Sequence, residues 1–390
     1  MRKPLAFLIT FAMIVCMFPL NAYGSQEAPQ PLSEKEFREK WNVRSSVRKV
    51  ILDTDLGFFL DDVYALHALL QADRLGYLEL CGITTCCGNS YTAGVTYDTL
   101  AYLDHVGSDI PVYQGSDTPL SGEIDLAQLE KLSGKMSFCG FYDLRDRYTN
   151  DYRKALENGL AWWNGKAPES VPMEQSAADY IIEEIHRYPG EVTILALGGL
   201  TNIARALQKD PGIAQDAAGI IYMGGVFDVW GEDQKQQEFN FWCDPVAANI
   251  ALSAGWKNQV IASHDAATTC LKTYDLYRIA SEHNHNPFSE LFLAHYEEGC
   301  GSPEEIERKF EEDLPYCWDP ITITYILCPE ICTSIETRYL RIDDRMGPTY
   351  GSTLNWREGK QPENTYPAQV ILSVDQDRFW EFLFDLFDAQ

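Results

Sequence analysis

Short apolar runs alternate with segments of helical hydrophobic spacing along most of the chain. The apolar runs predict strands at 48–53, 78–86, 110–113, 191–197, 218–223 and 258–263. Apolar residues repeat every three or four positions between and after these runs, which predicts helices that include 62–73, 92–106, 174–187, 201–208, 244–254, 288–299 and 319–327. Strands that alternate with helices are typical of a parallel sheet covered on both faces. The expected fold class is therefore α/β, a Rossmann-like open, mostly parallel sheet with helices on both faces.

Two later segments depart from this alternation. Residues 121–172 contain Trp162, Trp163 and few clean periods, which is typical of an insertion or a lid. Residues 336–373 return to strand-like runs, and 376–388 have the apolar spacing of an amphipathic helix.

The first residues of the chain have the pattern of a secretory signal. Arg2 and Lys3 precede an apolar stretch at 5–20, and small residues follow at 22–24. The apolar stretch is shorter than the roughly 20 residues that a membrane-spanning helix requires. We therefore expect a signal peptide at 1–24, a charged tether at 25–47, a single folded domain at 48–390, and a periplasmic or extracellular protein without membrane attachment after cleavage.

Composition narrows the classes of partner. The chain has 390 residues and a formal net charge of -27, without a basic stripe that could meet phosphates. This argues against binding to nucleic acids or to anionic membranes. Ten cysteines remain after the expected signal, and their spacings do not match a zinc site, so buried free thiols are expected for most.

Four carboxylates gather where the first strand meets the first helix. Asp53 and Asp55 follow the apolar run, and Asp61 and Asp62 begin the helical spacing. An acidic N-cap over a solvated surface would account for one or two of these groups, but four repel one another unless a cation or bound hydroxyls compensate them. A site made only of oxygen ligands favours calcium or magnesium over zinc, and calcium tolerates irregular coordination.

Further polar motifs lie at the predicted ends of later strands and at helix starts. Each is unspecific alone, because Gly88-Asn89 could be a turn, 197–204 a helix start capped by Thr201 or Asn202, and 318–320 an N-cap followed by proline. The ordered set is more specific. The order DTDxG, DD, TTxxGN, GGLTNIA, MGG, EFN and DP resembles the calcium-dependent nucleoside hydrolases, the inosine-uridine preferring group and its purine-preferring relatives. The resemblance runs from about Lys49 to about Leu386.

This resemblance implies one bound calcium ion and the residues that hold it. Asp55 matches a metal ligand that is also the general base, and Asp62 matches a bidentate ligand. Asp319 and the backbone carbonyl of Leu197 would complete the metal shell. Asp53 matches a supporting acid that accepts hydrogen bonds behind the ligands.

The same resemblance implies a ribose site and a reaction. Its sugar contacts would come from Asp61, Asn89, Met223, Glu238 and Asn240. The implied reaction is hydrolysis of the N-glycosidic bond of a ribonucleoside, in which a calcium-bound water is activated by Asp55 and the ribosyl centre gains oxocarbenium character. Members of the family are commonly dimers or tetramers, which makes a homodimer or a homotetramer an expected assembly.

Trp318 stands where pyrimidine-tolerant members carry a histidine that could act as a general acid. An indole cannot protonate a departing base, but it can stack on a purine, as the resemblance to the purine-preferring branch implies. We therefore include Trp318 among the catalytic candidates, with Trp162, Trp163 or Trp230 as a source of the opposite face. The alternative is a tryptophan packed only for its area.

Two departures from the motif set bear on the substrate. Phe58 and Phe59 lengthen the acidic turn, and 231–234 lacks an asparagine expected before Glu238. These changes leave open a modified nucleoside or another ribosyl compound.

Two further functions fit part of the pattern. A haloacid dehalogenase-type phosphatase would use Asp53 as nucleophile and Asp55 as acid and base with magnesium, but it has no role for Asp61 and Asp62. A calcium-dependent ribosyl-ligand binding protein would retain the site without turnover.

Overall fold

The computed structural model describes residues 31–43, 49–57, 61–122, 124–135, 138–142, 167–231, 236–283, 286–312 and 315–390. Residues Pro31–Gln390 belong to one compact unit. The expected signal peptide at 1–24 lies outside the described residues, and so do Phe58, Phe59, Trp162 and Trp163. Export of the protein, the role of the insertion and the effect of the two phenylalanines on the substrate therefore stay predictions.

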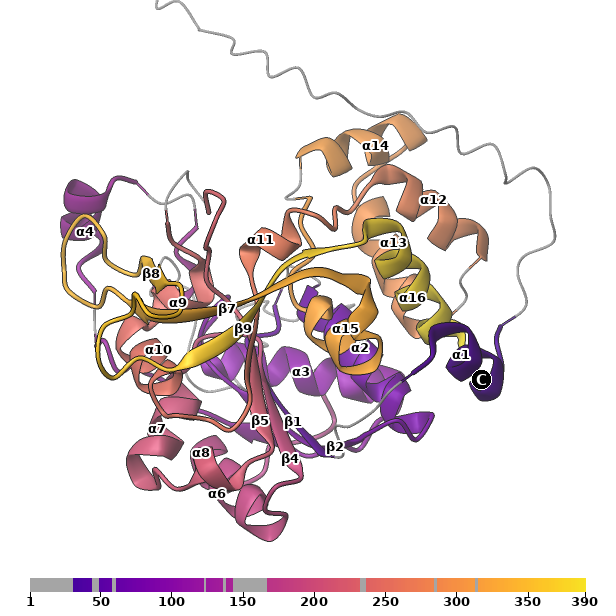
Figure 1. The fold of residues 1–390 in the computed structure, drawn as a ribbon. Coiled ribbons are helices and arrows are strands. Elements are labelled where there is room, and N and C mark those ends of the chain that lie inside the picture. Colours follow the sequence, from indigo (N-terminus) through magenta and orange to yellow (C-terminus); the bar gives the residue numbers. More distant parts are fainter. Residues whose placement is uncertain are drawn as a thin grey trace, which may run out of the picture. The chain divides into compact units, whose positions relative to one another are not determined.

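A nine-stranded sheet forms the centre of the described unit (Figure 1). The strand order is β3-β2-β1-β4-β5-β6-β9-β7-β8. The bounds are β1 (Lys49–Thr54), β2 (Glu79–Thr85), β3 (Val112–Gln114), β4 (Val192–Ala196), β5 (Gly219–Met223), β6 (Gln259–Ala262), β7 (Cys332–Ile342), β8 (Thr353–Trp356) and β9 (Pro367–Val374).

All six strands predicted from the apolar runs are present and pair in parallel. Strand β9 extends this parallel part beside β6, and β7 runs antiparallel to both β9 and β8. The fold is therefore the expected α/β class, with a mostly parallel sheet. The strand order places the first strand between β2 and β4, so the chain reverses its direction of winding there, as in sheets that bind ligands at their carboxyl edge.

Helices cover both faces of the sheet, because strand residues point alternately to two apolar clusters. Val50 and Leu52 of β1 belong to one cluster and Ile51 to the other. Helices that contribute to the first are α2 (Asp61–Arg74), α3 (Thr92–Val106), α12 (Tyr274–His283), α13 (Pro287–Glu297), α14 (Pro303–Glu312), α15 (Pro320–Leu327) and α16 (Gln376–Asp388). Helices that contribute to the second are α6 (Ala177–Arg187), α7 (Thr201–Lys209), α8 (Ile213–Asp216) and α10 (Pro245–Leu252).

The N-terminal segment contradicts part of the expected tether. Residues Glu34–Trp41 form helix α1, which begins with a capping box at Ser33. Phe37 is fully buried, and its ring lies 5.7 Å from that of Phe382 in α16. Two aromatic residues at an i, i+4 spacing bury one face of a short charged helix. The folded unit therefore includes residues 34–41 of the expected tether. Because six of these eight residues are charged, their sequence does not indicate a buried helix.

The described part of the insertion at 121–172 contains two short elements. Helix α4 (Leu126–Ser133) and the 3-10 helix η1 (Gly140–Tyr142) contribute to a third apolar cluster with Phe239 and Trp242. Residues 143–166 lie outside the described residues. The described part of the insertion therefore packs against the short helix α9 (Phe239–Cys243), which carries Asn240.

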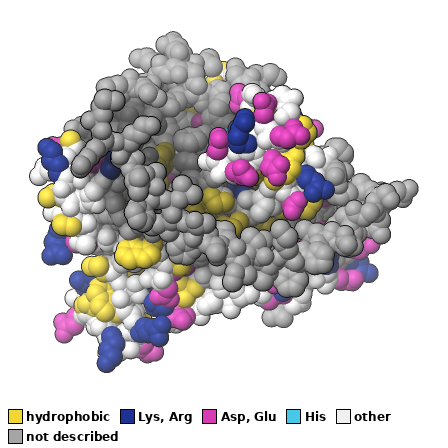
Figure 2. Space-filling view, turned by 90° about the horizontal axis from the view of Figure 1, so that it is seen from above, with side chains coloured by type: hydrophobic (Ala, Val, Ile, Leu, Met, Phe, Trp, Pro, Cys, Tyr) yellow, Lys and Arg dark blue, Asp and Glu magenta, His cyan; other side chains and the backbone are white. Residues whose placement is uncertain are grey.

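The described cysteines agree with the sequence-based expectation. All ten cysteines in the described residues are free thiols, and most are buried. Figure 2 shows acidic and basic side chains interspersed on the described part of one face, with apolar side chains in a hollow. Among the described helices, none combines the length and the hydropathy needed to cross a membrane.

Candidate active site

The candidate site lies where the central strands end. Strand β1 ends one residue before Asp55, β2 ends four residues before Asn89, and β4 ends one residue before Leu197. Because β1 pairs in parallel with both β2 and β4, these residues meet at one edge of the sheet.

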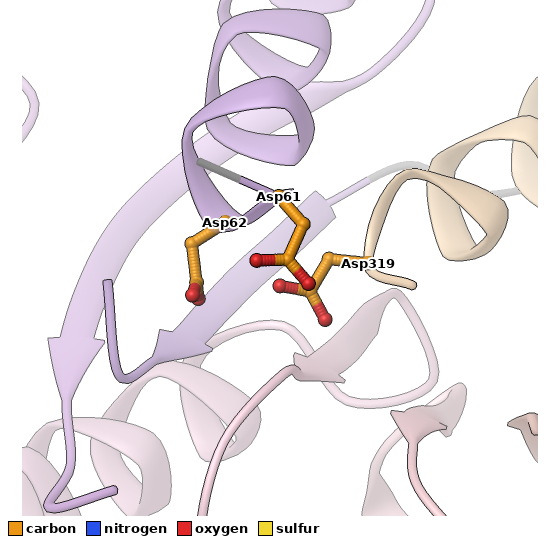
Figure 3. A group of neighbouring side chains, drawn as sticks. All are labelled: Asp61, Asp62 and Asp319. Carbon is orange, nitrogen blue, oxygen red and sulfur yellow. The ribbon is translucent and has the colours of Figure 1, made fainter. Parts of the chain in front are cut away.

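Three carboxylates converge at this edge (Figure 3). Asp61 and Asp62 begin helix α2 and Asp319 precedes Pro320 at the start of α15, and each offers a ligand atom within 4.8 Å of the others. The carboxylates of Asp61 and Asp319 point toward each other. Sequence reasoning placed Asp61 at the sugar, whereas the structure groups it with two of the predicted metal ligands.

Asp319 does not use its side chain to cap the helix that follows it. It occupies the N-cap position of α15 with Pro320 at the first helical position, as the sequence predicted, but its side chain makes no capping hydrogen bond. A capping carboxylate would have used its oxygens on backbone N–H groups. The Asp319 carboxylate instead lies beside that of Asp61.

Asp55 lies beside this group but is not one of the three. It is 2% exposed, and its Oδ2 accepts a hydrogen bond of 2.7 Å from the backbone N–H of Asn89. The Asn89 side chain donates to the Asp55 carbonyl at 3.3 Å and to Asp62 Oδ2 at 3.5 Å. Asn89 therefore links the predicted base to a predicted metal ligand, in addition to its expected sugar contact.

Two glycines of the motifs leave room for the Asp55 side chain. A Cβ on Gly88 would lie 1.9 Å from Asp55 Oδ2, and one on Gly198 would lie 2.6 Å from Asp55 Oδ1. Contacts this short cannot exist, so any other residue would displace the carboxylate. Gly88 and Gly198 therefore matter because they have no side chain that would displace Asp55. From the sequence, their two motifs indicated only a turn and a helix start.

The acids of this edge carry raised pKa values in the absence of a cation. Burial, helped by the charges of Asp61 and Glu238, raises the pKa of Asp55 to about 8 against the hydrogen bond from the Asn89 backbone. Burial and the neighbouring Asp55 and Asp61 hold the pKa of Asp62 well above its usual range. Burial and Asp61 do the same for Asp319. A divalent cation would offset this mutual repulsion, so the donor set fits a hard metal ion.

Thr54 was not singled out from the sequence, although it stands inside the DTD motif. Its hydroxyl donates to Asp62 Oδ1 and accepts a hydrogen bond of 3.2 Å from the backbone N–H of Leu56. Thr54 therefore orients Asp62 across the acidic turn.

Asp53 lies in β1, two residues before Asp55. It is fully buried, and its Oδ1 accepts hydrogen bonds from Thr84 Oγ1 at 2.6 Å and Asn202 Nδ2 at 2.8 Å. Burial raises its pKa to about 7, against those two hydrogen bonds. Asp53 Oδ1 is thus held by side chains from two neighbouring elements, which fits a supporting role better than that of a phosphatase nucleophile.

The fourth-strand motif does not cap its helix. Helix α7 begins at Thr201, and neither Thr201 nor Asn202 makes a capping hydrogen bond. The Thr201 hydroxyl donates to Asp244 at 2.6 Å, and Asn202 holds Asp53. The capping reading of this motif was therefore wrong, because both side chains contact acids from other elements.

The predicted sugar residues Met223 and Asn240 lie together at the ends of β4 and β5. Asn240 Nδ2 is 2.7 Å from the carbonyl oxygen of Leu197 and 3.2 Å from the sulfur of Met223. The Leu197 carbonyl is the predicted backbone ligand of the metal. Asn240 therefore connects the sugar side of the site with the metal side.

Glu238 has a structural role that the sequence did not indicate. It is the N-cap of α9, where its two oxygens accept hydrogen bonds from the backbone N–H groups of Asn240, Gly225 and Phe241 at 2.7, 2.8 and 3.2 Å. Burial raises its pKa to about 7 despite these bonds. Among the described residues, Oε1 accepts only the bond from Asn240, so a sugar hydroxyl can still donate to the second lone pair of that oxygen.

Trp318 is 8% exposed and belongs to the first apolar cluster. Its indole N–H donates to His264 Nδ1 at 3.1 Å. Its neighbour in sequence, Asp319, places it at the border of the acidic group. Of the other tryptophans proposed for the opposite face of a base, Trp230 is 61% exposed.

The fold and this edge define an α/β protein with a cluster of carboxylates at the carboxyl ends of its strands. Residues 50–381 match the family model described as inosine-uridine preferring nucleoside hydrolase. The chain is 27% identical to the probable uridine nucleosidase 1 of Oryza sativa subsp. japonica, covering 87% of this chain and 97% of that protein. It is 26% identical to the inosine-uridine preferring nucleoside hydrolase of Crithidia fasciculata, covering 87% and 96%.

A solved structure agrees with these matches. The plant nucleoside hydrolase PpNRh1 superposes with a TM-score of 0.69 and 26% identity, covering 88% of this chain and 99% of that chain. The chain therefore belongs to the inosine-uridine preferring nucleoside hydrolase family. Members of this family are enzymes that hydrolyse N-ribosyl bonds of ribonucleosides, and this chain is one of them, which favours an enzyme over a binding protein without turnover.

Proposed function

We propose that this enzyme hydrolyses purine ribonucleosides to free base and ribose with one bound calcium ion. The observation that carries the proposal is the group of Asp61, Asp62 and Asp319, whose ligand atoms lie within 4.8 Å of one another. Buried carboxylates in this arrangement are stable as anions only with a compensating cation.

Four groups of this chain would hold the ion: the carboxylates of Asp55, Asp62 and Asp319 and the carbonyl of Leu197. All four are oxygen donors, which suits calcium. When bound, calcium supplies a positive charge that holds a sugar diol and polarises the attacking water. Asp61, which the structure places in the acidic group, would lie next to both the ion and the sugar.

Asp55 would take the proton from the attacking water. Its Oδ2 is oriented by the Asn89 backbone, and Gly88 and Gly198 leave space around both oxygens. A buried carboxylate whose pKa lies near the working pH is suited to general-base catalysis.

Asn89, Glu238 and Asn240 would hold the ribose through its hydroxyl groups, with Met223 against the ring. These polar side chains are all buried. A substrate without the matching hydroxyl leaves buried polar groups unpaired, which costs much more binding than a lost surface contact. A 2′-deoxyribonucleoside should therefore be a poor substrate.

Two observations favour different nucleobases. Trp318 beside Asp319 favours stacking on a purine. The relatives named as uridine nucleosidases favour uridine instead. We propose the purine reading, because an indole in the position next to Asp319 has no proton to give to a departing pyrimidine.

Release of base and ribose from inosine, adenosine, guanosine, uridine and 2′-deoxyinosine, with calcium and after chelation, tests this proposal. We expect purine ribonucleosides to be cleaved faster than uridine, and chelation to abolish both activities. Faster cleavage of uridine would reverse the proposed preference. Full activity after chelation would remove calcium from the proposal.

We further propose that the enzyme is exported and acts outside the cytosol as a homodimer or a homotetramer. The charged start, apolar stretch and small residues at 1–24 support export. Mass spectrometry of the secreted protein should find an N-terminus near Ser25, and light scattering would give the assembly. An intact Met1 in the secreted fraction would contradict signal cleavage.

A further inference from the structure

His264 contacts the indole of Trp318, although no motif of the sequence pointed to it. The Trp318 Nε1–H donates to His264 Nδ1 at 3.1 Å. The two ring centroids lie 6.3 Å apart, and the ring of Tyr316 packs within 5.3 Å of His264 and 5.5 Å of Trp318. His264 is 2% exposed. The indole plane is therefore constrained by one hydrogen bond and one aromatic neighbour.

The backbone of His264 is anchored to the sugar side of the site. It is the first residue of the short helix α11 (His264–Ala267), and its N–H donates to the Gly225 carbonyl at 2.9 Å. The N–H of Gly225 in turn donates to Glu238 Oε2 at 2.8 Å. Hydrogen bonds through Gly225 and His264 thus connect Glu238, a predicted sugar contact, with Trp318, which is proposed to stack on the nucleobase.

The chain after α11 also holds the segment that leads to Trp318. The N–H of Lys272 donates to the Pro315 carbonyl at 2.5 Å, and Leu271 forms an antiparallel bridge with Tyr316. The thiol of Cys270 lies 3.1 Å from the Cys317 carbonyl. Of these contacts between the two segments, the one between His264 and Trp318 is made by the indole side chain itself.

The ring of His264 is suited to accept this hydrogen bond. Burial lowers its pKa below the usual value, and the charge of Asp265 offsets this only in part. A neutral imidazole that accepts at Nδ1 carries its proton on Nε2.

We propose that His264 is a positioning residue for the leaving group: its Nδ1 fixes the plane of the Trp318 indole relative to the sugar site, so that the indole faces the departing base. The inference rests on the proposed stacking of Trp318. Loss of the acceptor would let the indole rotate about its side-chain torsions, and a misplaced group near the reaction centre lowers turnover more than binding.

Two substitutions separate positioning from other roles. His264→Leu removes the acceptor, whereas His264→Asn keeps an oxygen close to the place of Nδ1. We expect His264→Leu to lower kcat on inosine about tenfold with little change in KM, and His264→Asn to stay within about twofold of the parent. His186→Leu is the matched control, since His186 pairs with Asp210 and its side chain is 44% exposed.

Trp318→Phe supplies a second line of evidence. Phenylalanine keeps an aromatic face but has no N–H to donate, so His264→Leu should cause no further loss of kcat in that background. The indole N–H resonance of Trp318, assigned by its disappearance in Trp318→Phe, should move in His264→Leu. If His264→Leu does not fold, a parent-like kcat of Trp318→Phe overturns the inference.

The remaining outcomes are distinct. A parent-like kcat of His264→Leu, with a displaced indole resonance, overturns positioning while nucleoside hydrolysis stands. Equal losses of kcat in His264→Leu and His264→Asn also overturn the proposal, since they would mean that Nε2 rather than Nδ1 is the atom that matters. A parent enzyme that cleaves uridine and ignores purines refutes the proposed stacking itself, and the indole resonance then still reports whether the hydrogen bond exists.

Discussion

Asp55 occupies the most constrained position of the site. The Asn89 backbone holds one oxygen, glycines at 88 and 198 leave space for the carboxylate, and the remaining acids lie nearby. A side chain held in this way fits the general-base role that we propose for Asp55.

Asp55→Asn should reduce kcat by a factor of about 10³ or more, since it removes both a general base and a charge from the metal shell. The substitution keeps the shape of the side chain, so the protein should remain folded. Turnover of inosine and the melting temperature in calcium test this together. A folded variant with more than about a tenth of the parent kcat would show that another group is the base.

Gly88→Ala should abolish turnover without a charge change, because its Cβ would lie 1.9 Å from Asp55 Oδ2. The expected cause is displacement of Asp55, so calcium affinity should fall as well. Gly347→Ala is the matched control, since the nearest atom to a Cβ there lies 3.8 Å away. Calcium titration by calorimetry and kcat would be measured for both. Parent-like values for Gly88→Ala would refute the close approach.

Helix α1 shows how an element with many charges can belong to the core. Six of its eight residues are charged and the other two are aromatic, so its composition favours a tether. Phe37 and Trp41 are the exceptions, and α16 supplies their partners from the other end of the chain. Trp41 packs edge-on against Phe382 at 5.4 Å and donates to Asp385 at 2.7 Å.

Trp41→Ala should lower the free energy of unfolding by about 3 kcal/mol or more, the usual cost of removing a large buried aromatic side chain. Lys35→Ala on the same helix is the control, because the Lys35 side chain is 80% exposed. Chemical denaturation of both variants gives the comparison. Equal stability of the two would mean that residues 34–41 do act as a tether.

Elements with long, regular patterns were predictable. Strands β1 to β6 and helices α2, α3, α6, α7, α10, α13, α15 and α16 all lie within a few residues of their predicted bounds. Helices α1, α4, α8, α9, α11, α12 and α14 were not predicted. Short helices such as α9 and α11 take their stability from caps and packing, so their own residues carry a weak periodic signal.

The raised pKa values of the buried acids make the folding stability of the whole molecule depend on pH. In the cation-free protein, pKa values are raised to about 8 for Asp55 and to about 7 for Asp53 and Glu238. The folded chain therefore keeps protons that the unfolded chain has lost between about pH 4 and about pH 8. Raised carboxyl pKa values mean that folding stability is lost as pH rises through this window.

The melting temperature of the chelated enzyme should therefore fall between about pH 5 and about pH 8. Calcium binds the ionised carboxylates, so saturating calcium should remove this decline and raise stability most at the higher pH. Thermal melts with chelator and with calcium test both statements, and Asp319→Asn should reduce the difference between them. A chelated melting temperature that rises across the window would contradict the raised pKa values.

The order of motifs along the chain was enough to indicate the fold class, the family and the identity of the acids. Periodicity depends on local spacing, and family motifs are read residue by residue, so both are visible without coordinates. The spatial grouping of Asp61 with Asp319, the capping by Glu238 and the contact between His264 and Trp318 join residues 13 to 258 positions apart or serve other elements. Such contacts depend on how the sheet brings distant strand ends to one edge, and no local pattern encodes that arrangement.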